Sequence, residues 1–149
     1  MGLFDAIDIA GSGLTAERLR MDVTAENLAN AQTTRGAGGG PYQRKEVVLE
    51  QAGGSAFGTM LTGAIGGVRA AESANGVQVA AIVEDNSQQR LVYDPAHPDA
   101  NGQGYVAMPN VNPVTEMVDL ISSSRSYEAN VTSMQSAKQM FTKTLELLR

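Results

Sequence analysis

The chain has 149 residues, of which 42% are hydrophobic, and this suggests one globular domain or one domain with an inserted lobe. A formal net charge of −5 disfavours a nucleic-acid binder, which needs a basic surface to neutralise phosphates. Without Cys, the chain has no disulfide, no thiolate metal site and no cysteine nucleophile. No apolar run approaches the ~18 residues of a membrane span. Asp5 and Asp8 lie where a cleaved signal peptide would be basic, so we expect no such peptide.

The first predicted element is a helix over about residues 3–31. Four apolar residues repeat every seven positions and fall on one stripe of a helix, as in the seam of a coiled coil: Ile7, Leu14, Met21 and Leu28. Gly11 and Gly13 weaken this helix early, because each Gly costs ~1 kcal/mol relative to Ala in a helix.

The middle of the chain predicts a small β-rich lobe with long loops. Residues 36–41 combine Gly and Pro and predict a flexible turn or linker. Residues 51–76 hold seven Gly and no clear period, which predicts a loop. Short apolar runs predict four strands, at residues 42–49, 77–83, 91–93 and 105–107.

The last predicted element is a helix over residues 113–149. Asn112 can cap its start, and Pro113 suits its first turn. Alternating steps of three and four residues predict a seam of Met117, Leu120, Ser124, Tyr127, Val131, Met134, Lys138, Phe141, Leu145 and Leu148. At ~1.5 Å per residue the helix is ~55 Å long, which exceeds a compact domain of this size and calls for a partner.

Together these elements predict an α+β fold in which the N- and C-terminal helices pair as an antiparallel coiled coil. Residues 1–34 and 112–149 form the predicted helical core domain. Residues 35–111 form the predicted β-rich lobe, inserted between the helices.

Candidate chemistry is sparse. His97 lies between Asp94 and Asp99, where an imidazole can hold a metal or act as a base, although the two nearby prolines favour a structural turn. Asn27 and Asn30 lie at the end of the first helix, and their amides either cap that helix or bond a neighbouring chain. We identify no catalytic, metal-binding or cofactor-binding residues.

Several ordered motifs resemble the bacterial flagellar rod and hook proteins. AENLANAQT at residues 25–33 is similar to the N-terminal signature of that family, and NVNPVTEMVDLI at 110–121 with RSYEAN at 125–130 is similar to its C-terminal signature. Three further motifs resemble the C-type proximal rod proteins of the family: GPYQRKEVV at 40–48, YDPAHPDAN at 93–101 and GYV at 104–106. One departure is Glu26, where rod and hook proteins more usually have Asn.

The resemblance implies a structural subunit of the proximal rod, which forms a tubular drive shaft in the periplasm and transmits torque for motility. Its implied partners are copies of itself, other rod proteins, a membrane-ring-to-rod adaptor and the flagellar type III export apparatus, which exports it without a cleaved signal. No cofactor, nucleic acid or small-molecule substrate is implied. The predicted interface residues for assembly are Ile7, Leu14, Met21, Asn27, Leu28, Asn30, Met117, Leu120, Tyr127, Val131, Met134, Phe141, Leu145 and Leu148.

Two alternatives come from other functional classes. A small metal-dependent hydrolase would be built around Asp94, His97 and Asp99, for which the sequence offers few further ligands. A soluble coiled-coil adaptor would bind a partner helix in trans and form a small oligomer in place of a tube.

Overall fold

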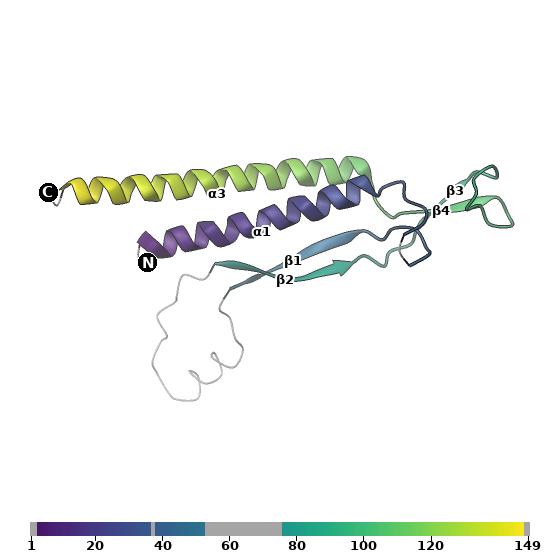
Figure 1. Cartoon of the computed structure of the whole chain (residues 1–149), viewed down its shortest axis with the longest axis horizontal. Helices are drawn as coiled ribbons and strands as arrows, with labels where there is room; N and C mark the ends of the chain where they lie inside the picture. The colour runs from purple at the N-terminus through teal and green to yellow at the C-terminus, as the bar shows by residue number, and fades with distance from the viewer. Residues whose placement is uncertain (1–2, 37, 53–75, 148–149) are drawn as a thin grey trace, which may run out of the picture. The chain divides into compact units, whose positions relative to one another are not determined.

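The computed structural model describes residues 3–36, 38–52 and 76–147 of the chain. Its elements are α1 (Leu3–Ala29), β1 (Lys45–Gln51), β2 (Val77–Glu84), β3 (Arg90–Tyr93), β4 (Tyr105–Met108) and α3 (Pro113–Leu147) (Figure 1). The fold is therefore α+β, with a helix at each end of the chain and a small β region between them, as predicted. The predicted loop at residues 51–76 lies almost entirely outside the described residues.

The chain divides into two compact units. The first unit comprises Met1–Arg18, Leu49–Ala80 and Arg125–Arg149, and the second comprises Leu19–Val48 and Ala81–Ser124. Each unit thus combines a part of α1, a part of the β1–β2 sheet and a part of α3. Among the described residues, no helix has the length and apolarity to cross a bilayer.

In the first unit, α1 continues through Gly11 and Gly13, where the sequence predicted weakness. The reason is close approach to α3. A Cβ on Gly13 would lie 2.9 Å from Nδ2 of Asn130, and one on Gly11 would lie 3.8 Å from Cε of Met134. Between the glycines, the Ser12 hydroxyl donates to the Ile9 carbonyl at 2.8 Å, a bond within the helix. The glycines therefore lower the helix propensity of α1, but they allow α1 and α3 to approach closely.

The start of α3 follows the prediction. Oδ1 of Asn112 accepts a hydrogen bond from the Val114 N–H at 3.1 Å, and the Asn112 carbonyl accepts from the Glu116 N–H at 3.1 Å. Pro113 occupies the first helical position, where a missing N–H costs nothing. Asn112 is thus the N-cap of α3.

The burial pattern of α3 differs from its apolar pattern. The buried positions are Glu116, Ser123 and Ala137, which are small or polar. They are separated by seven and fourteen residues, so they lie in one row along the helix. The adjacent row is half-buried and consists of Leu120, Tyr127, Met134 and Phe141. Apolar side chains one position further along are exposed, by 46% at Met117 and 51% at Leu145. One row of the predicted seam therefore lies beside the buried face, whereas the other row is exposed at Met117 and Leu145 and half-buried at Ser124 and Val131.

The β region consists of two separate two-stranded sheets, β1–β2 and β3–β4. The β3–β4 hairpin is antiparallel and pairs Leu91 with Ala107 and Tyr93 with Tyr105. Val106 is 1% exposed and anchors one face of the hairpin, because side chains alternate between the faces of a strand. The four predicted strands are confirmed, with bounds that shift by up to three residues.

Candidate functional site

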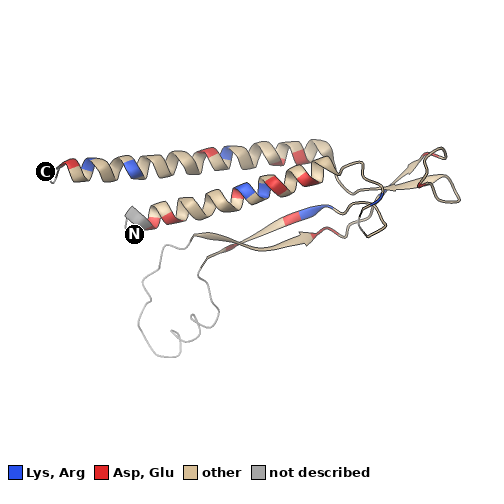
Figure 2. Ribbon diagram, in the orientation of Figure 1, with Lys and Arg blue, Asp and Glu red and all other residues tan. Residues whose placement is uncertain are grey.

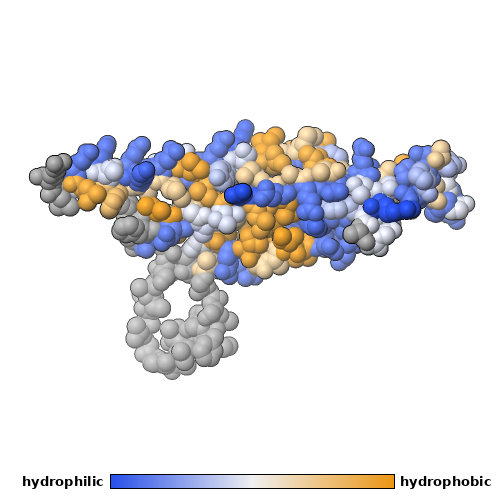
Figure 3. Space-filling model, in the orientation of Figure 1, coloured by the Kyte–Doolittle hydropathy of each residue, from blue (hydrophilic) through white to orange (hydrophobic). Residues whose placement is uncertain are grey.

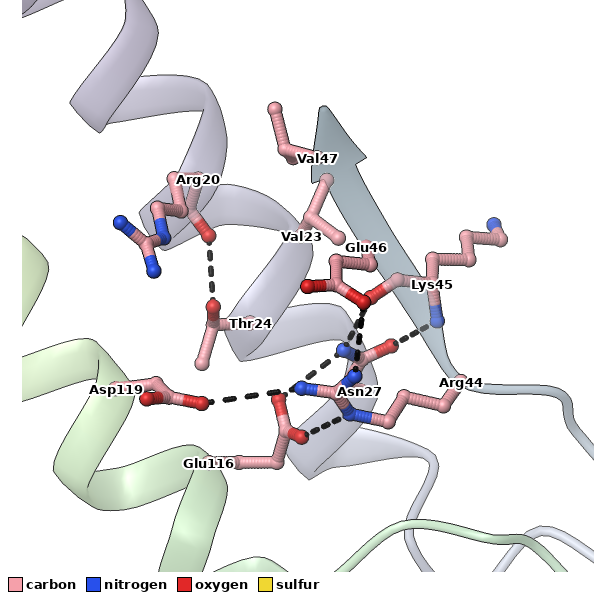
Figure 4. Close-up of a pocket in the computed structure, with 10 residues that line it drawn as sticks. All are labelled: Arg20, Val23, Thr24, Asn27, Arg44, Lys45, Glu46, Val47, Glu116 and Asp119. Carbon is pink, nitrogen blue, oxygen red and sulfur yellow. Dashed lines mark hydrogen bonds and ion pairs between the residues drawn. The ribbon is translucent and has the colours of Figure 1, made fainter. Parts of the chain in front are cut away.

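The second unit contains a buried polar cluster where the end of α1, the start of β1 and the start of α3 meet (Figure 4). We call it the polar junction; it consists of Asn27, Tyr42, Arg44, Lys45 and Glu116. Glu116 and Asn27 are each only 1% exposed. Polar side chains this deeply buried need partners, because an unpaired buried charge costs several kcal/mol.

Glu116 is the charged centre of the polar junction. Its Oε1 accepts a hydrogen bond from Nε of Arg44 at 2.6 Å, and its Oε2 accepts one from Nδ2 of Asn27 at 3.1 Å. The guanidinium also faces Glu46 at 3.6 Å and Asp119 at 3.8 Å. The hydrogen bond that Arg44 donates to Glu116 raises the pKa of Arg44 further above its ordinary value, so the guanidinium stays charged.

Asn27 connects this ion pair to the backbone of β1. Its Nδ2 donates to the Lys45 carbonyl at 2.8 Å, and its Oδ1 accepts from the Lys45 N–H at 2.9 Å. Oδ1 also accepts from the Tyr42 hydroxyl at 2.8 Å. Burial, followed by the negative charge of Glu26, raises the pKa of Tyr42. The Asn27 amide thus bonds both the N–H and the carbonyl of Lys45, the first residue of β1, as the backbone of a neighbouring strand would.

Glu26 has a partner that an Asn could not hold as well. Its Oε1 accepts from Nζ of Lys45 at 2.7 Å, and the same ammonium lies 5.8 Å from the centre of the Tyr42 ring. This hydrogen bond is the main cause that raises the pKa of Lys45. The departure from the usual Asn therefore supplies an ion pair at the edge of the polar junction. Figure 2 marks the acidic and basic positions along α1 and β1.

Asn110 joins the polar junction to the chain that follows β2. Its Oδ1 accepts from the Arg44 N–H at 3.0 Å, and its Nδ2 donates to the Asp85 carbonyl at 3.0 Å and to Oγ of Ser87 at 2.9 Å. Asn27, Asn30 and Asn112 of the terminal signatures form side-chain hydrogen bonds as well.

The cavity beside the polar junction is too small for a substrate. Its volume is about 50 Å³, and its lining includes Thr24, Val23 and Asp119 (Figure 4). Ligand sites measure roughly 300–1,000 Å³, whereas a water needs only ~10–15 Å³. This cavity therefore suits one or a few waters. A second, open hollow of about 530 Å³ is lined in part by Tyr42, Lys45 and Glu26.

The loop around His97 is tied down by its own backbone and by Asp99. Nδ1 of His97 accepts from the Asp99 N–H at 3.1 Å, and the Asp99 carboxylate accepts from the Thr34 hydroxyl at 2.9 Å and pairs with Arg35. The Thr34 hydrogen bond, assisted by the Arg35 charge, lowers the pKa of Asp99. Across the described ranges, no group of three or more His, Cys, Asp or Glu could hold a metal ion. These contacts agree with the structural reading of this turn.

The predicted interface residues fall into four groups. Asn27 is buried in the polar junction, and Nδ2 of Asn30 donates to the Glu26 carbonyl at 2.9 Å while its Oδ1 accepts from Thr33. Met117 and Leu145 are exposed. Leu148 lies outside the described residues. The rest are half-buried: Ile7, Leu14, Met21, Leu28, Leu120, Tyr127, Val131, Met134 and Phe141. Their role in assembly stays a prediction.

The sequence did not reveal the centre of the polar junction. From its position in the first turn of α3, Glu116 indicates only a favourable interaction with the positive end of the helix dipole. Its partner Arg44 lies 72 positions away, so no local spacing connects the two. The usable signal was that Arg44 and Glu116 each belong to a motif shared with the rod family.

Comparisons with known proteins agree with the motifs. Residues 7–37 match the family model described as flagella basal body rod protein, and residues 103–147 match that described as flagellar basal body rod FlgEFG protein C-terminal. The flagellar basal-body rod protein FlgC of Bacillus subtilis is 49% identical, with 99% of each chain covered. FlgC of Borreliella burgdorferi is 45% identical over 100% of this chain and 99% of its own, and FlgC of Salmonella typhimurium is 42% identical over 99% and 98%.

Proposed function

Because the chain belongs to the family of flagellar basal-body rod proteins, we propose that it helps to build the tubular drive shaft of the proximal rod and transmits torque through it. The observation that carries this function is full-length similarity to rod proteins, with both terminal helices matched by rod family models. The chain is a structural subunit of the flagellar basal-body rod, and neither the hydrolase nor the adaptor alternative is favoured.

The proposal includes an antiparallel coiled coil of the two terminal helices, with residues 1–34 and 112–149 as the helical core and 35–111 as the inserted lobe. Two observations support the pairing. In the first unit, Gly11 lies near Met134, and Gly13 lies near Asn130. The contacts thus run forward along α1 and backward along α3, as in an antiparallel pair. In the second unit, Asn27 of α1 bonds Glu116 of α3.

The predicted interface residues are the proposed contacts between subunits. Their support is that single-chain packing leaves large apolar side chains on α3 uncovered, Met117 among them at 46% exposure. A tube wall would cover this surface, because helices that are apolar beyond one stripe are usually buried. We propose that Asn27 contributes from within, by fixing the polar junction.

The subunit assembles with other rod components in the flagellar basal body. We propose copies of itself, a membrane-ring-to-rod adaptor and the type III export apparatus as specific partners, with the rod in the periplasm and no cleaved signal. The resemblance in the terminal motifs supports these partners. In this proposal the subunit needs no cofactor and catalyses no reaction. Intact-mass analysis of the chain from purified basal bodies checks the absence of cleavage, since removal of a signal would lower the mass.

The test is complementation of an in-frame deletion. We expect loss of swimming, its recovery with the intact chain, and the chain in purified basal bodies. Met117→Asp should abolish recovery, because it places an unpaired charge in a dry contact. Thr115→Asp is the matched control, since Thr115 is also exposed on the first turns of α3. A chain absent from wild-type basal bodies would refute the function; equal swimming of both variants would refute the contact at Met117.

A further inference from the structure

The β3–β4 hairpin presents an uncovered apolar face. Leu91 is 60% exposed, Tyr93 65% and Tyr105 40%, and we call these three residues the hairpin face. The two Tyr rings meet edge to face with centroids 5.2 Å apart, so they stiffen each other. Gly104 holds the turn at a φ of +79°, and a Cβ there would lie 3.0 Å from the Tyr93 ring. The hairpin face is therefore preorganised, which lowers the entropy lost on binding.

A second uncovered face lies on the first turns of α3, in the same unit. Val114 is 64% exposed, Met117 46%, Val118 60% and Ile121 53%, and we call these four residues the helix face. Their spacing of three, four and seven residues places them on one side of the helix. Figure 3 shows hydrophobic residues gathered over these turns.

The helix face is free of charge although acidic residues interrupt its sequence. Glu116 is buried in the polar junction, and Asp119 is turned toward Arg44, from which it lies 3.8 Å. The hairpin face carries no charged side chain either. Two copies of a chain with net charge −5 repel each other, so a contact between copies is favoured where both surfaces are neutral.

The two faces also match in size. Four residues of strand extend about 13 Å, and the seven-residue step from Val114 to Ile121 rises about 10 Å. We propose, resting on the proposed function, that the hairpin face of one copy docks on the helix face of a second copy within the rod. Different patches meet in such a heterologous contact, which propagates along a ring or helix and does not close as a pair.

The occupant is a second copy because copies of this chain are among its proposed partners in the rod, and because Leu91 and Tyr93 of the hairpin face lie outside the stretches that the shared rod family models match. The shared rod family models match residues 7–37 and 103–147, so they include the helix face but not β3. The FlgC relatives align over nearly the whole chain. Leu91 and Tyr93 therefore lie where FlgC-type proteins can differ from other rod proteins, and a contact made by them can select the neighbouring subunit.

The contact is too small to hold two free subunits together. Seven half-exposed side chains offer on the order of 800 Å² in total, below the roughly 1,200–2,000 Å² of stable pairs. We therefore expect it to form only within the rod, alongside other contacts.

Disulfide cross-linking in basal bodies tests the proposal cleanly, because the natural chain has no Cys. We would compare Tyr93→Cys with Ile121→Cys against Tyr93→Cys with Ser122→Cys in cells that lack the wild-type chain. Ser122 is exposed like Ile121 but turned by about 100° around α3. The first pair should give a ladder of cross-linked oligomers at a yield at least about tenfold above the second, because disulfides require close Cβ atoms.

Three results would overturn the proposal. Equal yields from the two pairs, with the chain present in basal bodies, would remove the contact and leave the proposed function intact. A dimer from Tyr93→Cys alone would indicate hairpin-to-hairpin pairing. If the first pair fails to enter basal bodies, Leu91→Cys with Val118→Cys provides the same test on two other exposed positions, and absence of its ladder overturns the proposal. Absence of the wild-type chain from basal bodies would instead refute the proposed function.

Discussion

Replacement of Glu116 tests the polar junction most sharply. Its carboxylate accepts from two donors, Nε of Arg44 at 2.6 Å and Nδ2 of Asn27 at 3.1 Å. Glu116→Gln leaves one acceptor oxygen for these two donors, and its own NH₂ group then faces the other donor. Glu116→Ala removes both bonds and leaves the guanidinium with only the distant carboxylates of Glu46 and Asp119.

The expected losses follow from these contacts. A hydrogen bond to a charged group contributes roughly 1.5–3 kcal/mol, and breaking a buried ion pair costs roughly 3–5 kcal/mol. The Arg44 side chain remains 22% exposed, so water offsets part of the loss of its partner. We therefore expect Glu116→Gln to lower the free energy of unfolding by about 2 kcal/mol and Glu116→Ala by about 3 kcal/mol.

Denaturant unfolding of the full chain, followed by circular dichroism, measures these losses. Glu128→Gln is the control, because it is the same substitution at an exposed position of α3. It should lower the free energy of unfolding by less than about 0.5 kcal/mol. A double-mutant cycle with Arg44→Met should give a coupling energy above about 1 kcal/mol. Equal stability of Glu116→Gln and Glu128→Gln would refute the argument that the polar junction stabilises the fold.

Three further changes have directions set by the structure. Ser123→Ala should raise the free energy of unfolding by about 0.5–1 kcal/mol, because the buried Oγ has no hydrogen-bond partner among the described residues and Ala favours helix; thermal melts check this. Gly11→Ala should stabilise the chain by up to ~1 kcal/mol, whereas Gly13→Ala should not, because its Cβ would meet an amide 2.9 Å away. The pKa values of Tyr42 and Lys45 are raised above their ordinary 10.0 and 10.5, so the unfolded chain releases these protons first. Stability should therefore persist below pH 10 and fall as the pH rises through the folded pKa values, with a smaller fall in Tyr42→Phe; no fall above pH 10 would contradict it.

Local signals predicted most of the fold. Asn112 before Pro113 marked the start of α3, because cap chemistry depends only on adjacent residues. Alternating apolar runs located the four strands for the same reason. Apolar spacing also identified both helices, since its period survives even where side chains are only half covered.

Which side of each helix is buried depended on distant residues. The inward positions Ser123 and Ala137 of α3 are less apolar than the exposed Met117 and Ile121, so hydropathy alone does not identify the row that is buried within the chain. In the first unit, Gly13 against Asn130 shows why: close helix approach rewards small residues, and large apolar ones remain outside. In the polar junction, Glu116 is buried only because Arg44, far along the chain, pairs with it. No local pattern encodes such a partner.

A cryo-electron microscopy reconstruction of the proximal rod in isolated basal bodies tests the central claim most directly, because it shows side chains in the assembled wall. Our account predicts that this chain occupies the rod, with Glu116 still paired with Arg44 and with Val114, Met117, Val118 and Ile121 covered by a neighbouring subunit. A rod whose density fits other proteins only, or one in which these four side chains face solvent, would contradict it.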